Sequence, residues 1–161
     1  MKNALILGFG NPDRQDDGVA WHILQRVCKA LGRVVPQSIE DDFPLFGDEY
    51  PHFLFDLQLT PEMSELLAEY PFVCFVDAHT GSQPDDFHQE DLQAHFQRSP
   101  LTHHMTPETV LALTDQIYHK QPQSLLISVR GYSFGFMQGL SPQTEALSVQ
   151  AVEQILTWLQ N

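Results

Sequence analysis

Apolar residues along the chain alternate between short continuous runs and patterns at helical spacing, which predicts alternating strands and helices. Residues 4–7 form an apolar run before a glycine-rich turn, as in a strand buried on both faces of a parallel sheet. A helical pattern follows from Gly18 and stops at Gly32, a residue type that favours helix ends. Its apolar positions are Val19, Ile23, Val27 and Leu31. A strand, a loop and a helix are therefore expected at the N-terminus.

Three further apolar runs predict three more strands. The run at 52–58 is followed by another helical pattern, which Thr60 can cap and Pro61 can open. The other two runs lie at 72–76 and 124–129. Each is short enough for a strand buried in a sheet.

Two more helices are expected in the C-terminal half. One begins at Thr106 and Pro107, and the last begins at Ser141 and Pro142. The apolar face of the last helix is expected to consist of Ala146, Val149, Val152, Ile155, Leu156 and Leu159. Strands that alternate with helices predict an α/β fold, a three-layer α/β/α sandwich around a mostly parallel central sheet. At 161 residues, the chain fits a single domain, residues 1–161.

Chemistry in such sheets gathers at the carboxyl ends of the central strands. Two segments fall there, the loop at 8–18 and the end of the third run at 76–81. The loop begins like a dinucleotide-binding turn, but Asp13 stands where the third glycine is needed. Asp16 and Asp17 also place negative charge where a pyrophosphate would lie. A nucleotide-binding domain is therefore the least favoured of the functions considered.

Acidic side chains occupy both of these segments. Asp16 and Asp17 precede a helix start, so one of them can cap the helix, although a cap position takes only one side chain. Asp77 ends a buried run, where an ionised carboxyl costs desolvation unless something pairs with it. A neighbouring loop could satisfy Asp77, or the acid could serve catalysis or metal binding. Both alternatives stay open on these residues alone.

A histidine pair, His103 and His104, lies in a polar segment before the helix at Thr106. Adjacent side chains of an extended chain point in opposite directions, so at most one of the two is expected to be a ligand. Two carboxylates and one imidazole suit a borderline divalent ion such as nickel or zinc and leave positions open. His79, two residues after Asp77, could supply a fourth ligand.

The string GFGNPDRQDDG, from Gly8 to Gly18, resembles the opening signature of the hydrogenase maturation endopeptidases, G-x-G-N followed by D-D-G or D-E-G. The segments VDA, THHM and GLSP fall in the order found in that family, so the resemblance spans almost the whole chain. Two segments depart from it. RGYSFGF lacks the usual proline, and HFLFDLQLTPE replaces the D-G-G-T type of second strand, which suggests a different hydrogenase as partner.

The resemblance implies an endopeptidase that removes the C-terminal extension of the nickel-loaded large-subunit precursor of a [NiFe] hydrogenase. Carried over residue by residue, it assigns Asp17, Asp77 and His103 to both catalysis and nickel binding. His103 is favoured over His104 because the apolar residues that follow the family histidine then match as well. These are Met105, Val110 and Leu111. The nickel is expected to arrive with the precursor and not to be bound tightly by the free enzyme.

The chemistry of cleavage stays open between two forms. In the first, the metal activates a water molecule and a carboxylate acts as general base. In the second, carboxylates carry out the chemistry without direct catalysis by the metal. No G-x-S-x-G motif is present, and Cys28 and Cys74 lie in apolar runs that predict buried free thiols. The alternative function is a non-catalytic nickel-binding accessory protein of hydrogenase assembly, which would use the same three residues.

The composition of the chain disfavours some classes of binding partner. With 21 acidic and 8 basic residues the net charge is −13, which disfavours nucleic acid. The N-terminal apolar run is too short for a signal peptide or a membrane span, so a cytoplasmic location without membrane attachment is expected. The protein is also expected to be a monomer. Selectivity for the precursor is expected in the loops at 85–88 and 130–134. Tyr132 and Phe134 are the candidate interface anchors, unless they pack internally.

Overall fold

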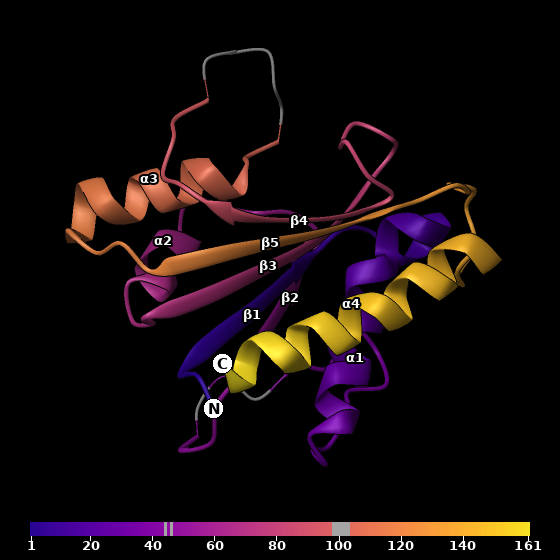
Figure 1. Cartoon of the computed structure of the whole chain (residues 1–161), viewed down its shortest axis with the longest axis horizontal. Coiled ribbons are helices and arrows are strands. Elements are labelled where there is room, and N and C mark those ends of the chain that lie inside the picture. The colour runs from indigo at the N-terminus through magenta and orange to yellow at the C-terminus, as the bar shows by residue number, and fades with distance from the viewer. Residues whose placement is uncertain (44, 46, 98–103) are drawn as a thin grey trace.

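The computed structural model describes residues 1–43, 45, 47–97 and 104–161. Within these ranges, five strands form one sheet in the order β2-β1-β3-β5-β4 (Figure 1). The strands are β1 (Ala4–Phe9), β2 (His52–Asp56), β3 (Phe72–His79), β4 (Phe87–Leu92) and β5 (Gln123–Arg130). Neighbouring strands pair in parallel except for β4, which runs antiparallel to β5. The predicted α/β fold with a mostly parallel sheet is thus confirmed.

Helices cover both faces of the sheet (Figure 1). The helices α1 and α4 share one apolar cluster with the sheet, whereas α2 and α3 share a second cluster on the other face. Their bounds are α1 (Val19–Ala30), α2 (Met63–Leu67), α3 (Pro107–Tyr118) and α4 (Pro142–Gln160). Because side chains alternate across a strand, Val76 of β3 reaches the α1/α4 side and Phe75 reaches the α2/α3 side. The helices therefore form the two outer layers of the fold.

The sequence predicts a loop at 85–88, but Phe87 and His88 begin the edge strand β4. The prediction was wrong because β4 has no apolar run. Its middle residues are exposed, and of its six positions only Leu92 is buried. An edge strand that is open to solvent in this way carries polar residues and gives little apolar pattern in the sequence.

The apolar stripe predicted for α4 is also partly wrong. Ile155 and Leu159 are buried, but Val149 is 50% exposed. Small residues take the remaining inward positions, and Ser148 accepts a hydrogen bond from Arg26 of α1. The same arginine pairs with Glu145 at 2.7 Å, so α1 and α4 approach each other through polar contacts that hydrophobic spacing cannot reveal.

The helix starts were predicted with mixed success. The predicted starts of α3 and α4 are confirmed, and Thr106 and Ser141 cap these helices through side-chain oxygens that accept from a backbone N–H three residues later. Thr60 does not cap α2, because Glu62 occupies the cap position and makes no side-chain cap bond. This helix is only five residues long, and its first residue, Met63, is buried in the apolar cluster that α2 shares with α3.

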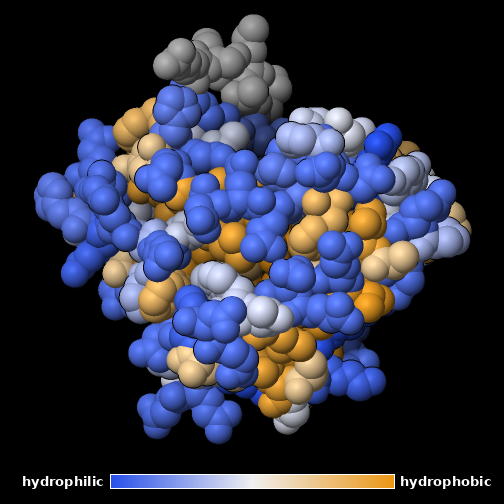
Figure 2. Space-filling model, in the orientation of Figure 1, coloured by the Kyte–Doolittle hydropathy of each residue, from blue (hydrophilic) through white to orange (hydrophobic). Residues whose placement is uncertain are grey.

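Hydrophilic residues cover most of the face seen in Figure 2, with apolar residues gathered toward its middle. Both cysteines, Cys28 and Cys74, are buried free thiols, as predicted. Burial raises the pKa of both thiols, so neither is poised to act as a nucleophile. Among the helices in the described ranges, none is long and apolar enough to cross a membrane.

Candidate functional site

The loop after β1 folds back on itself as a 3₁₀ segment at Pro12–Gly18. Gly10 has φ +139°, a conformation that residues with a side chain rarely adopt, and a Cβ there would collide with the backbone carbonyl of Asp17. The backbone N–H of Asn11 donates to Oδ2 of Asp17 at 2.8 Å. Glycine at position 10 therefore allows the loop to hold Asp17 against the end of β1.

Asp16 points inward and is fully buried. Its carboxylate accepts backbone N–H groups of Tyr132, Ser133 and Ser141 at 2.7–2.9 Å, and the Ser141 hydroxyl at 2.6 Å. Burial alone would raise the pKa of Asp16, but the bonds from Ser141, Tyr132 and Ser133 outweigh burial and leave it below its ordinary value. Asp16 thus fastens the first loop to the segment between β5 and α4.

Neither adjacent acid caps α1. The cap position belongs to Gly18, which makes no side-chain cap bond. The cap interpretation of Asp16 is therefore wrong, because its side chain serves a contact between distant segments. The GLSP segment has a structural role, because its Ser141 both caps α4 and donates a hydrogen bond to Asp16.

Asp77 lies near the carboxyl end of β3, which continues two residues further to His79. It is on the α2/α3 face, two residues beyond Phe75, and its Oδ1 is shut off from solvent without a hydrogen-bond partner among the described residues. Burial raises its pKa to about 7, and repulsion by Glu108 and Asp17 acts in the same direction. Asp77 is therefore a strongly perturbed carboxyl beside the first loop and the start of α3.

His79 does not offer a free ligand atom. Its Nδ1 accepts the backbone N–H of Gly81 at 3.1 Å, so Nε2 carries the hydrogen and donates to the carbonyl of Asp86 at 3.2 Å. Burial lowers the pKa of this imidazole, which favours the neutral ring. His79 therefore holds the turn after β3 and is engaged at both nitrogens.

His103 lies outside the described residues, so its distance to the two acids is not defined. His104 is exposed, and its backbone carbonyl accepts the side-chain amide of Gln97 at 2.9 Å. Within the described ranges, no three histidine, cysteine, aspartate or glutamate side chains are grouped to hold a metal ion. The structure thus brings Asp17 and Asp77 to one edge of the sheet and leaves the third predicted residue as an expectation.

The segment after β5 lies against the first loop. Backbone N–H of Gln15 donates to the carbonyl of Met137, and Arg14 donates to the carbonyl of Phe134 while stacking over the ring of Phe136. Phe136 is 88% exposed and Met137 60% exposed. Apolar side chains therefore stand in solvent on a segment that hydrogen bonds hold against Arg14 and Gln15 of the first loop.

The turn before β4 joins the same region. Asp86 accepts the Tyr132 hydroxyl at 2.9 Å and the Arg130 guanidinium at 3.1 Å. The expectation that both flanking loops lie at the carboxyl edge of the sheet agrees with these contacts. Tyr132 is only 38% exposed and Phe134 is partly buried, so the most exposed aromatic of this segment is Phe136, which the sequence reasoning did not single out.

Sequence reasoning also missed three polar neighbours of Asp77. These are Glu108 in α3, Ser128 in β5 and His88 in β4. A helix signal marked the start of α3, but Ser128 sits inside an apolar run and His88 in a strand that was not predicted. Only strand order and register bring them to Asp77.

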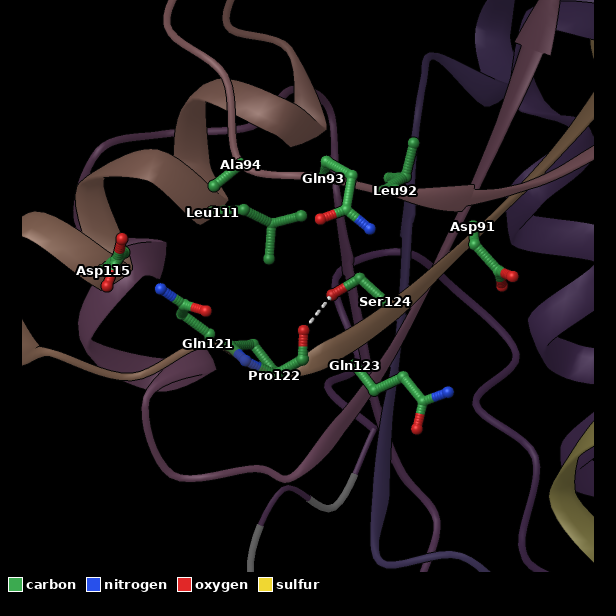
Figure 3. Close-up of a pocket in the computed structure, with 10 residues that line it drawn as sticks. All are labelled: Asp91, Leu92, Gln93, Ala94, Leu111, Asp115, Gln121, Pro122, Gln123 and Ser124. Atoms are coloured by element: carbon green, nitrogen blue, oxygen red, sulfur yellow. Dashed lines mark hydrogen bonds between the residues drawn. The ribbon is translucent and has the colours of Figure 1, made fainter.

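A hollow of about 460 Å³ lies away from this edge, where β5 begins (Figure 3). The end of β4, the α3 residues Leu111 and Asp115, and residues 121–124 line it. Ser124 donates its hydroxyl to the carbonyl of Pro122 at 2.9 Å, so this polar group is already engaged. The hollow contains neither Asp17 nor Asp77.

Solved structures of [NiFe] hydrogenase maturation proteases match this chain over nearly its whole length. HycI from Thermococcus kodakarensis has a TM-score of 0.67 at 17% identity, covering 99% of this chain and 94% of that protein. HybD from E. coli has 0.62 at 23%, covering 99% and 93%. A hydrogenase 2 maturation peptidase from a Thaumarchaeota archaeon has 0.60 at 20%, covering 99% of each. No protein-family model matches the sequence, and no curated protein matches it significantly. The chain therefore has the fold of the [NiFe] hydrogenase maturation proteases.

Proposed function

We propose that this chain is an endopeptidase that removes the C-terminal extension of the nickel-loaded large-subunit precursor of a [NiFe] hydrogenase. Two independent features support the proposal. One is the fold, which it shares with solved maturation proteases over 99% of its length. The other is the pair of acids, Asp17 and Asp77, near the carboxyl edge of the sheet, where α/β folds bind their ligands.

The observation that carries the proposal is the state of Asp77. Its Oδ1 is buried without a donor, a costly arrangement for a carboxylate. Because its pKa is about 7, the group is close to half protonated at neutral pH. An approaching cation can displace that proton and supply the missing partner. Asp17, whose charge acts on Asp77, adds a second oxygen ligand of the kind that a divalent metal accepts.

In this proposal the nickel belongs to the substrate. Asp17, Asp77 and His103 occupy the open positions of the ion already seated in the precursor, and the free enzyme holds no tightly bound metal. Docking on the ion brings the scissile peptide bond beside the carboxylates, which contributes proximity before any acid–base step. A carboxyl with a pKa near neutrality can also accept a proton from the attacking water. Nickel is thus a checkpoint, because a precursor without it does not dock.

The partner surface is expected beside these acids. Phe136 and Met137 project from a segment that is held by Arg14 and Gln15 of the first loop. Exposed aromatic and methionine side chains next to a polar site are favoured contacts in protein interfaces. We place the recognition of the precursor here, in a cytoplasmic monomer, and not in the metal-binding residues, which must meet the same ion in every partner.

The proposal is tested by incubating the purified protein with nickel-loaded and nickel-free precursor and measuring the intact mass of the precursor. Loss of a C-terminal peptide from the nickel-loaded form alone is the expected result. Binding of the nickel-loaded precursor without mass loss would instead identify a non-catalytic nickel-binding accessory protein. Equal cleavage of both forms would remove nickel from the account.

A further inference from the structure

Three polar side chains form one row across three neighbouring strands. Asp77 of β3 is the register partner of Ser128 in β5, and Ser128 is the register partner of His88 in β4. Register partners point to the same face of a sheet with their Cβ atoms about 4.5–5.5 Å apart. All three therefore face the layer of α2 and α3, and Ser128 stands between the acid and the imidazole.

The middle member of the row, Ser128, is buried. Ser128 is 1% exposed, and its Oγ has no hydrogen-bond partner of normal geometry in the described residues. The neighbouring Oδ1 of Asp77 is equally buried and equally without a donor. The hydroxyl lacks an acceptor and the neighbouring carboxylate lacks a donor. A small rotation of the serine side chain would therefore form a hydrogen bond from the hydroxyl to the carboxylate. In agreement, Ser128 lowers the pKa of Asp77, against the larger effect of burial.

The outer member of the row, His88, lies on the edge strand β4. The side chain of His88 is 12% exposed, and its Nε2 lies 3.0 Å from the Glu90 carboxylate on the same face of β4. His88 and Asp77 thus flank Ser128 on the two neighbouring strands, and Ser128 itself is almost fully buried. Water has little access to the hydroxyl, which leaves Asp77 as its natural acceptor.

We propose that Ser128 is a positioning residue, which donates its hydroxyl hydrogen to Asp77 and fixes the orientation in which this carboxylate meets the ion of the precursor. The effect on cleavage rests on the proposed function, whereas the contact itself does not. Groups that orient a metal-binding side chain commonly change metal affinity or activity by about 10-fold to 100-fold when they are removed. A loss of that size is expected for Ser128→Ala.

The experiment compares Ser128→Ala and Ser128→Thr with a matched control, Ser124→Ala. Ser124 lies on the same strand and the same face, is 3% exposed, and bonds to Pro122 far from Asp77. Cleavage of nickel-loaded precursor should fall about 10-fold or more in kcat/KM for Ser128→Ala. Ser128→Thr, which keeps the hydroxyl, should restore most of it, and Ser124→Ala should stay within twofold of the parent protein.

A double-mutant cycle makes the inference independent of catalysis. The free energy of unfolding is measured in urea for Ser128→Ala, Asp77→Ala and the double variant, and contacting residues should give effects that do not add. Additive effects would overturn the inference, as would equal losses of cleavage in Ser128→Ala and Ser124→Ala. If the effects on stability are not additive but the parent protein never cleaves the precursor, the contact between Ser128 and Asp77 stands and the proposed function is rejected. If Ser128→Thr does not fold, the two alanine variants and the cycle still decide.

Discussion

Replacing Asp16 with asparagine tests whether this acid holds the first loop in place. The asparagine side chain can keep one oxygen where Oδ2 accepts three donors, but its amide nitrogen then faces the backbone N–H of Ser141, which loses its acceptor. Leaving that buried donor unpaired costs about 1–3 kcal/mol. The three hydrogen bonds to Oδ2 also change from bonds to a carboxylate into bonds to a neutral amide, at a cost of at most about 1 kcal/mol each. The sum is smaller than three times this figure because such contributions are not additive. We expect Asp16→Asn to lower the free energy of unfolding by about 3–4 kcal/mol.

The assay is urea denaturation at pH 7, with Asp13→Asn as the control. Asp13 is exposed in the same loop, and its carboxylate accepts the side-chain amide of Gln138, so its substitution should change stability by less than about 0.5 kcal/mol. The folded-state pKa of Asp16 lies below its ordinary value of 3.8. The stabilisation is therefore present above pH 4 and is lost as the pH falls through the folded pKa, so the two proteins should converge in acid. A loss below about 1 kcal/mol at pH 7 would refute the reasoning.

Three further predictions concern the site. Asp77 has a raised pKa of about 7, so its own contribution to the stability of the fold falls as the pH rises from about 4 to 7. Asp77→Asn should therefore be more stable than the parent at pH 8, by about 2–4 kcal/mol in urea denaturation, while it abolishes cleavage. His103→Ala should abolish cleavage and His104→Ala should retain most of it, which mass spectrometry of the precursor checks; the reverse pattern would shift the assignment by one residue. Phe136→Ala should weaken precursor binding about 10-fold in titration calorimetry without changing the thermal midpoint by more than about 1 °C, because 88% of this side chain is exposed; unchanged affinity would remove it from the interface.

Much of the fold could be predicted because buried parallel strands are continuous apolar runs. The strands at Ala4–Phe9 and Gln123–Arg130 follow such runs closely. The edge strand β4 escaped because polar residues suffice where one side of a strand meets solvent. The inward stripe of α4 escaped for a related reason, since Ser148 is buried by a contact with Arg26. Patterns of hydrophobicity thus identify strands and helix faces that have apolar neighbours and miss those that polar contacts hold in place.

The site shows the same division. Asp17 and Asp77 were predicted from a loop signature and from an acid near the end of an apolar run, both of which are local in sequence. A helix cap was one interpretation of Asp16, and the sequence could not reveal its partners, Tyr132 and Ser141, which are 116 and 125 residues away. Ser128 could not be recognised, since its place beside Asp77 depends on which strands are neighbours and in what register. Local chemistry can be found in the sequence, whereas the contacts that orient it depend on the fold.

The central claim is that Asp17 and Asp77 act on a precursor that carries nickel. The most direct test is a single-turnover incubation of nickel-loaded precursor with excess enzyme, followed by intact-mass analysis of the precursor. The parent protein should release a C-terminal peptide, and Asp17→Asn and Asp77→Asn, with circular dichroism spectra like that of the parent, should release none. Release of the same peptide by either folded variant at the rate of the parent protein would contradict the account.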